Sequence, residues 1–301
     1  MFSIVIPLYN KALYIHKTIN SVLNQTFKNF ELIIVNDGST DNSLEIINEY
    51  NDNRIKIINQ NNSGVSSARN NGIKNAAYDL VAFLDADDWW DKNYLNELFN
   101  LIKKYPDAGL YGSNFYDVHK NKFSKSIKIP NFKEGYINYF KIYLKNMNSP
   151  IWSSACIINK KIINNYYFNE MLKGGEDLEY WIRIACHSKV AYLNECLSYY
   201  NHNEDENSTY NKIFNKENYY IFNIEHFNEY EKNNLLLKNL LDNLRVRSLK
   251  QYYVNNLYIS DVKNILKSVN KNNITFIYKL FYFLPPNIAY KINYLYNKIK
   301  C

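Results

Sequence analysis

The sequence predicts an α/β fold: a Rossmann-like, mostly parallel sheet flanked by helices, followed by a helical C-terminal extension. Two observations point to it. Over the first 110 residues, short apolar runs alternate with segments whose apolar residues recur at helical spacing. Beyond about residue 210 the strand-like runs stop and the pattern becomes mostly helical. We therefore expect two halves of one domain, at 1–110 and 111–209, and an extension at 210–301.

Four short apolar runs in the first half are expected to be strands. The first, Ser3 to Pro7, ends at a proline, and the others follow at 30–35, 55–58 and 80–84. Runs that are apolar on both faces are typical of strands buried in a parallel sheet. Parallel neighbours need right-handed crossover connections, so helices should cover both faces.

The segments between these runs are expected to be the crossover helices. Residues 15–23 place apolar side chains at helical spacing. Asn42 is expected to cap the second helix, with Glu45 three residues later as its capping-box partner. The third helix is expected at 64–77.

Polar and acidic residues follow three of the four strands. These residues are Tyr9–Asn10, Asn36–Ser39 and Asp85–Asp88. Such residues are common turn formers, and for any one loop that explanation suffices. In an open parallel sheet, however, ligands bind beyond the carboxyl ends of the strands, and all three loops lie there. The sequence therefore indicates a ligand site at this edge.

Asp85 and Asp87 are the first candidates for chemistry. Their spacing lets both carboxylates face one ligand if the turn curls. Hard oxygen ligands suit Mg²⁺ or Mn²⁺, which bind phosphates with one or two protein carboxylates. The glycine-rich fingerprints of P-loop and dinucleotide-binding proteins are absent from the sequence. A bound phosphate must therefore be held by metal and side chains.

A basic residue and a second acidic pair complete the candidate set. Arg69, in the third helix, could reach a base, ribose or phosphate, or form a surface ion pair. Glu176 and Asp177 follow two glycines at an expected helix N-terminus. They could merely cap that helix, or one could act as a general base that deprotonates a hydroxyl.

Six motifs in order carry a resemblance to a known family. They are Ser3–Asn10, Asn24–Phe27, Glu31–Asp41, Gly64–Gly72, Phe83–Asp88 and Gly175–Asp177. Together they resemble the inverting family 2 glycosyltransferases of the GT-A fold, of bacterial type. The match is dense over residues 1–110, thinner to about residue 209, and absent beyond.

The resemblance implies a role for each matching position on the donor side. Pro7 and Tyr9 would border the nucleotide pocket, with Tyr9 stacking on the base. Asp37 would accept a hydrogen bond from uracil, which favours a UDP-sugar donor. Arg69 would contact the base or diphosphate, and Asp85 the ribose or donor sugar.

It also implies the metal and catalytic groups. Asp87 would bind Mn²⁺ or Mg²⁺, and His202, which precedes Ser208–Thr209, resembles a late histidine near the metal. Asp177 would be the catalytic base and Glu176 would orient the acceptor, or the two would exchange roles. One in-line displacement by an acceptor hydroxyl would invert the anomeric carbon. The alternative is a non-catalytic nucleotide- or glycan-binding module of the same fold.

Charge distribution suggests a second surface. The net charge is +7, yet residues 1–110 carry 13 acidic against 10 basic residues. The lysines and aromatic residues of 274–300 could hold the protein at an anionic membrane, where lipid-linked acceptors lie, or could simply be a solvated helical cap. No nucleic-acid reader motif is recognisable.

The expected location is cytoplasmic, at the inner face of the inner membrane. The four cysteines lack metal-binding spacing and read as reduced thiols, and no apolar run or leader peptide suggests export or a membrane span. Abundant Asn, Lys, Ile and Tyr suggest an AT-rich bacterial genome, and hence surface polysaccharide or lipooligosaccharide synthesis.

Overall fold

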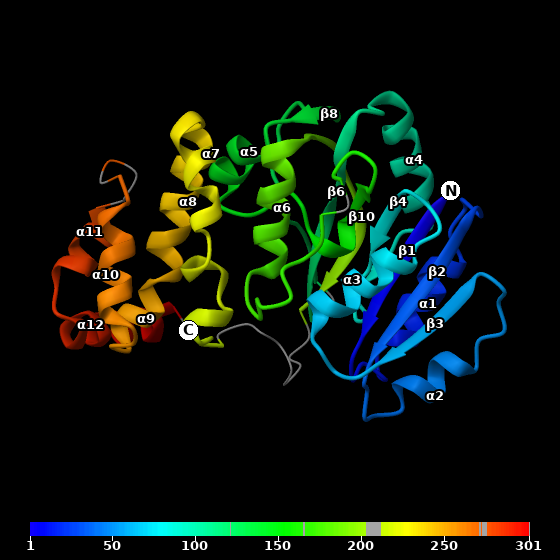
Figure 1. Cartoon of the computed structure of the whole chain (residues 1–301), viewed down its shortest axis with the longest axis horizontal. Coiled ribbons are helices and arrows are strands. Elements are labelled where there is room, and N and C mark those ends of the chain that lie inside the picture. The colour runs from blue at the N-terminus through cyan, green and yellow to red at the C-terminus, as the bar shows by residue number, and fades with distance from the viewer. Residues whose placement is uncertain (121, 165, 203–211, 271, 273–275, 301) are drawn as a thin grey trace. The chain divides into compact units, whose positions relative to one another are not determined.

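The computed structural model (Figure 1) describes residues 1–120, 122–164, 166–202, 212–270, 272 and 276–300, with backbone only at 276, 277, 280 and 294–300. Two compact units make up the chain. The first contains residues 1–170 and 176–208, and the second contains residues 171–175 and 209–301. The expected boundary between residues 209 and 210 lies outside the described residues.

The strands of the described chain all belong to the first unit and form one ten-stranded sheet. Their order is β3-β2-β1-β4-β9-β6-β10-β5, with β7 paired to β6 and β8 paired to β10. The strands are β1 (Phe2–Leu8), β2 (Phe30–Asp37), β3 (Ile55–Gln60), β4 (Leu80–Phe83), β5 (Trp89–Trp90), β6 (Ala108–His119), β7 (Lys122–Lys125), β8 (Glu134–Ile137), β9 (Cys156–Asn159) and β10 (Lys189–Asn201).

Strands β3, β2, β1 and β4 are parallel, which confirms the arrangement expected for the first 110 residues. Strand β9 then lies antiparallel to both β4 and β6, and β6 and β10 are parallel again. The expected α/β class is confirmed. Because the first four strands run the same way, the loops after β1, β2 and β4 emerge at one edge.

Six helices are described in the first unit and six in the second. The first six are α1 (Ile15–Leu23), α2 (Ser43–Asn48), α3 (Val65–Asn75), α4 (Tyr94–Lys104), α5 (Tyr139–Asn146) and α6 (Glu176–His187). The others are α7 (Asn228–Asn233), α8 (Leu235–Ser248), α9 (Lys250–Val254), α10 (Ile259–Lys267), α11 (Phe276–Phe283) and α12 (Pro286–Lys300). Short 3₁₀ turns lie at Ser153–Ala155, Lys216–Asn218, Tyr220–Phe222 and Glu225–Phe227.

Alternate residues of β1 face different helices. Ile4 and Ile6 belong to a core that also includes Ile19 of α1 and Leu98 of α4. Val5 points to the other face, against α3. There, a Cβ built on Gly72 would lie 2.3 Å from Val5 Cγ1, so only glycine permits this approach of helix and strand. Helices therefore cover both faces of the parallel strands, as the crossover rule predicts.

The expected capping box at α2 is wrong. The side chain of Asn42 makes no capping hydrogen bond. Instead, Asp41 Oδ1 accepts a hydrogen bond from Ser43 N at 3.0 Å, and Asp41 Oδ2 accepts one from Ala12 N at 3.0 Å. The carboxylate one residue earlier is the stronger acceptor and also ties this loop to the loop after β1.

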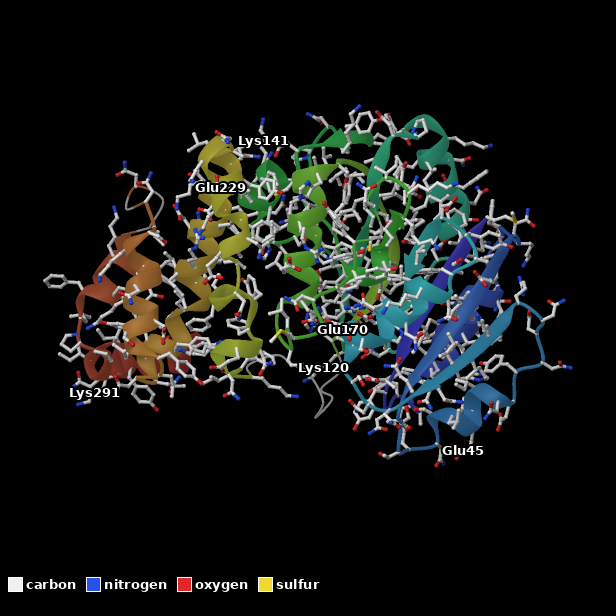
Figure 2. All side chains as sticks on the ribbon, in the orientation of Figure 1. Glu45, Lys120, Lys141, Glu170, Glu229 and Lys291 are labelled. Carbon is white, nitrogen blue, oxygen red and sulfur yellow. The ribbon has the colours of Figure 1, made fainter. Side chains whose placement is uncertain are left out.

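The second unit is helical and contains a buried ion network. Glu231 of α7 pairs with Arg245 of α8 at 2.5 Å, and Lys238 and Arg245 both contact the fully buried Asp242. In Figure 2, by contrast, Glu229 of α7 and Lys291 of α12 point outward. Charges are thus paired where they are buried, as burial requires.

Two further expectations concern the location of the protein. Among the helices of the described residues, none is long and apolar enough to cross a membrane. The cysteines at 156, 186 and 196 are free thiols, and Cys301 lies outside the described residues.

Candidate active site

Three loops form the ligand edge of the parallel strands. Asn10 follows β1 in a left-handed conformation (φ 50°), and its Oδ1 accepts a hydrogen bond from Thr40 N at 2.7 Å. Asn10 therefore joins the loop after β1 to the loop after β2. Tyr9, beside it, is 39% exposed, whereas Pro7 is buried within β1 opposite Val35.

Asp37, at the end of β2, is 3% exposed and accepts three hydrogen bonds from the protein. Its Oδ1 accepts hydrogen bonds from Gln60 Nε2 at 2.8 Å and Ser63 N at 2.9 Å. Its Oδ2 accepts one from Gly64 N at 2.8 Å. This carboxylate fixes the turn that starts α3, and its contact with uracil stays a prediction.

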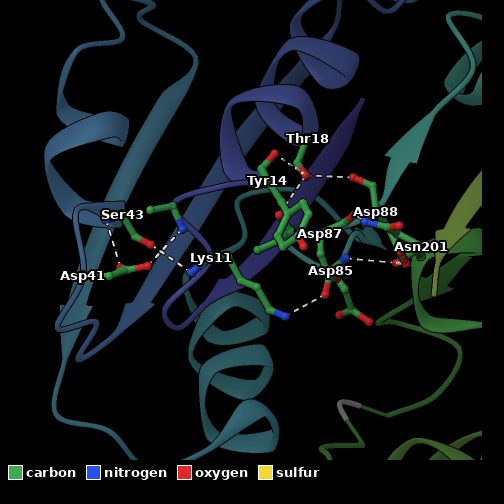
Figure 3. Close-up of polar contacts among 12 residues, drawn as sticks. Lys11, Tyr14, Thr18, Asp41, Ser43, Asp85, Asp87, Asp88 and Asn201 are labelled. Atoms are coloured by element: carbon green, nitrogen blue, oxygen red, sulfur yellow. Dashed lines mark hydrogen bonds and ion pairs between the residues drawn. The ribbon is translucent and has the colours of Figure 1, made fainter. Parts of the chain in front are cut away.

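The Asp85–Asp88 loop is held rigidly from several elements (Figure 3). Thr18 of α1 donates to the carbonyl oxygen of Asp88 at 2.7 Å. The buried carboxylate of Asp88 accepts hydrogen bonds from Ser154 Oγ at 2.5 Å and Asn201 N at 2.9 Å. Burial, reinforced by the charges of Asp87 and Asp85, raises the pKa of Asp88 well above its usual range. Asp88 thus ties the 3₁₀ turn at Ser153–Ala155 and strand β10 to this loop.

Asp87 faces a cation. Lys11 Nζ lies 2.8 Å from Asp87 Oδ2, and both side chains are partly exposed. Burial raises the pKa of Asp87, and Lys11 opposes that effect.

The residues present at Asp87 fit a divalent ion. The carboxylate of Asp87 offers oxygen atoms, and it already faces a positive charge, the ammonium group of Lys11. Within the described residues, no group of three or more His, Cys, Asp and Glu side chains could hold a metal. Mg²⁺ needs only one or two carboxylates when phosphates complete its shell.

Arg69, on α3, lies beneath the loop and is 4% exposed. Its Nη2 lies 2.7 Å from Asp85 Oδ1, and its Nη1 lies 3.8 Å from Glu176 Oε1. Burial alone would lower the pKa of Arg69, but the charges of Asp85 and Glu176 outweigh it and raise that pKa. One guanidinium therefore joins the loop after β4 to the N-terminus of α6.

Glu176 and Asp177 begin α6, as expected. Burial, followed by the charge of Asp177, raises the pKa of Glu176 to about 7. Burial also raises the pKa of Asp177, although Arg69 and a hydrogen bond from Leu178 N oppose it. A carboxylate with a raised pKa is suited to exchange protons near neutral pH.

His202 has other partners than Asp87. Its Nε2 lies 3.0 Å from Asp117 Oδ1, and its ring stacks on His119 with centroids 3.9 Å apart. The neighbouring Asn201 donates to the carbonyl oxygen of Asp87 at 3.2 Å. Ser208 and Thr209 lie outside the described residues. A metal-binding role for His202 stays a prediction.

Three residues at this site received no role from the sequence: Lys11, Asp88 and Tyr200. Burial raises the pKa of Tyr200, and so do the charges of four carboxylates on both sides of the site, at Asp88, Asp85, Asp87 and Asp177. Lys11 could have been recognised as a basic residue directly after Tyr9–Asn10. Tyr200 gave no sequence signal beyond its place near the end of a strand.

Comparison with known proteins identifies a family of sugar-transferring enzymes. The family model described as "Glycosyl transferase family 2" matches residues 3–168. That match covers more than half of the chain, so the chain belongs to glycosyltransferase family 2. The resemblance seen in the sequence motifs is confirmed.

Curated relatives are similar over part of their length. GlyA of Streptococcus pneumoniae is 39% identical over 122 residues, which are 40% of this chain and 17% of GlyA. EpsH of Bacillus subtilis is also 39% identical over 122 residues, 39% of this chain and 36% of EpsH. The chain thus spans well under two thirds of these relatives. WfgD of Escherichia coli, named a UDP-Glc:α-D-GlcNAc-diphosphoundecaprenol β-1,3-glucosyltransferase, is 31% identical over 64% of this chain and 73% of its own.

Solved structures share the fold. Residues 1–349 of TarS from S. aureus, in complex with UDP-GlcNAc, superpose with a TM-score of 0.70, covering 90% of this chain and 82% of that one at 21% identity. Another crystal structure of the same TarS fragment gives a TM-score of 0.57 at 25% identity, covering 66% and 60%. The expected GT-A fold is thereby confirmed.

Proposed function

We propose that the protein is an inverting glycosyltransferase that moves a sugar from a UDP-sugar to a hydroxyl of an acceptor glycan or glycolipid. The observation that carries the proposal is the contact of Arg69 with both Asp85 and Glu176. It joins the loop that would face the donor to the acidic pair that would face the acceptor. Family membership and the UDP-GlcNAc complex of the structural relative TarS support the choice of donor.

Asp177 is the proposed general base. Its carboxylate takes the proton of the acceptor hydroxyl while that oxygen attacks the anomeric carbon from the face opposite UDP. Glu176 orients the acceptor. The transition state has oxocarbenium character, as in glycoside chemistry generally. Since the attack and the departure of UDP occur on opposite faces, the anomeric configuration inverts.

The donor is held by residues of the ligand edge. Tyr9, which is exposed beside the loop after β1, would stack on the base, and Asp37 would accept from uracil. Asp87 would hold Mn²⁺ or Mg²⁺. When bound, such an ion neutralises charge on the departing diphosphate. His202, whose Nε2 lies 3.0 Å from Asp117 Oδ1, is the second residue proposed to hold this ion.

The proposed acceptor is a lipid-linked glycan of a surface polysaccharide or lipooligosaccharide pathway. WfgD, which is 31% identical, is named for transfer to a GlcNAc-diphosphoundecaprenol, and this supports a lipid-linked acceptor. Such an acceptor lies at the cytoplasmic face of the inner membrane, which is where the protein would act.

A panel of UDP-sugars tests the proposed function. We expect at least one UDP-sugar to be hydrolysed slowly in the presence of Mn²⁺ and to raise the melting temperature. A bound ligand stabilises a fold by about 2.7 kcal/mol at a concentration 100 times its Kd. GDP-sugars at the same concentration are the control. Thermal stabilisation by UDP-sugars without any turnover would favour the non-catalytic module.

The second unit has a surface suited to a membrane interface. Phe283, at the end of α11, is 86% exposed, and Ile288 and Ile292 lie one turn apart on α12, each 44% exposed. Lys279 and Lys291 are exposed on the same two helices. Exposed apolar side chains among lysines are typical of interfacial helices that bind anionic lipids. We propose peripheral binding through this surface.

Vesicle sedimentation tests the membrane proposal with the full chain. We expect the protein to pellet with vesicles containing phosphatidylglycerol, and the triple variant Phe283→Asn, Ile288→Asn, Ile292→Asn to lose most of that binding. The control, Leu235→Asn, removes an apolar side chain of the same unit that is 70% exposed. Equal pelleting of the triple variant and the control would contradict the proposal.

A further inference from the structure

Arg69 differs from an ordinary ion-paired arginine in how completely it is enclosed. It is 4% exposed, and its guanidinium also lies 5.3 Å from the ring centroid of Phe168. Among the described residues, its Nε and Nη1 have no hydrogen-bond partner. Its Nη2 donates a hydrogen bond to Asp85 Oδ1 at 2.7 Å, and its Nη1 lies 3.8 Å from Glu176 Oε1.

The acidic pair of α6 has several buried neighbours. Arg69 and Asp85 face it from α3 and the loop after β4. Further titratable groups that face Asp177 are Tyr139 of α5, Cys156 of β9 and Tyr200 of β10. These three are neutral at physiological pH, because burial raises the pKa of each. Among the described groups that face the pair, Arg69 is thus the cation that offsets Asp85, Glu176 and Asp177.

The backbone fixes the depth of Arg69. Gly72, one turn further along α3, lets the helix lie directly on Val5 of β1. Arg69 therefore lies buried beneath the loop after β4, and its side chain does not reach the exposed surface of that loop. A side chain in that position is well placed to act on the carboxylates and poorly placed to reach a base or diphosphate, the role that the family resemblance implied.

We propose that Arg69 is a positioning residue, which joins Asp85 to Glu176 and favours the ionised form of the Glu176–Asp177 pair, so that the pair can accept a proton near neutral pH. The inference rests on the proposed function, since it states how Arg69 favours the ionised form of the proposed base, Asp177. Arg69 acts through the carboxylates and does not touch the reacting atoms.

The expected effect follows from the charge balance. A cation within about 4–6 Å favours the ionised form of a carboxyl group and lowers its pKa by about one to three pH units. Without Arg69, the pair keeps its burial and the charge of Asp85, and only the N-terminus of α6 still favours ionisation. The pKa of each carboxyl must then rise. Activity that requires a carboxylate is consequently lost at neutral pH and returns as the pH increases.

The test compares Arg69→Met with Arg69→Lys and with Arg183→Met. Arg183 is a matched control, because it pairs with Glu179 on the same helix at 2.8 Å. For Arg69→Met we expect the acidic limb of the pH profile of kcat/KM to move up by about one pH unit or more. Arg69→Lys should restore part of that shift, and Arg183→Met should leave the limb in place. UDP affinity, measured by calorimetry, should stay within about threefold for all three variants.

A second measurement does not depend on turnover. The carboxyl ¹³C signals of Glu176 and Asp177, assigned with Glu176→Gln, should titrate at higher pH in Arg69→Met than in the wild type. Unshifted signals would overturn the inference, and so would a loss of UDP affinity with an unmoved pH limb, because Arg69 would then bind the nucleotide. If the wild type turns over no UDP-sugar while the carboxyl signals are shifted in Arg69→Met, the result would contradict the proposed function and not this inference.

Discussion

Asp177→Asn is expected to lower turnover by about 10²–10⁴-fold while leaving UDP affinity nearly unchanged. Asparagine keeps the shape of the side chain and an oxygen that can accept the hydrogen bond from Leu178 N. It cannot take a proton from an acceptor hydroxyl. Initial rates with a UDP-sugar and an acceptor, together with calorimetry of UDP, check this expectation.

The companion variant Glu176→Gln decides which member of the pair is the base. If Asp177 is the base and Glu176 orients the acceptor, Glu176→Gln should mainly raise the acceptor KM. Asp79→Asn is a suitable control, because Asp79 is a surface carboxylate paired with Lys161. A larger fall in kcat for Glu176→Gln than for Asp177→Asn would exchange the two roles.

Asp87→Ala is expected to abolish the part of UDP binding that depends on a divalent ion. In the wild type, Mn²⁺ should strengthen UDP binding, because Asp87 would hold the ion and the ion would offset the charge of the diphosphate. In the variant, UDP affinity with Mn²⁺ should fall to the value measured in a chelator. Calorimetry under both conditions measures the difference.

Asp107→Ala is the control for this variant, since Asp107 is an exposed carboxylate that pairs with Lys189 away from the ligand edge. The two catalytic-site variants also test each other. An equal loss of UDP binding in Asp87→Ala and Asp177→Asn would refute the division between a donor side and an acceptor side.

The parallel half of the sheet could be predicted because its signals are local. Each strand is a short apolar run, and each crossover helix has its own periodicity. Strand β9 could not be placed in this way, since four residues at 156–159 lie antiparallel between β4 and β6 for reasons of tertiary pairing. The α2 cap was also misjudged, because a hydrogen bond from Ala12 to Asp41 depends on a loop that is distant in sequence.

The candidate residues could be selected from sequence, but their partners could not. Arg69, Asp85 and Glu176 belong to three separate motifs of the sequence. No rule of spacing predicts that the guanidinium of Arg69 contacts both acids. For His202, the family resemblance alone implies a role, that of a late histidine near the metal. Its ring pairs with Asp117 because Asn201 of β10 lies opposite Val118 of β6, which puts the following residue beside the same strand.

Gly72 connects the packing of the sheet with the placement of Arg69, because both depend on how closely α3 lies on β1. A Cβ at that position would lie 2.3 Å from Val5 Cγ1, so a larger residue would require the helix or Val5 to shift, and Arg69 lies three residues earlier on the same helix. If Arg69 acts as proposed, a substitution at this buried position should therefore lower turnover, although the position does not face the ligand edge. Tyr9, at the exposed ligand edge, lies outside this buried contact, so a substitution there can alter the donor site and leave the contacts of Arg69 with Asp85 and Glu176 in place.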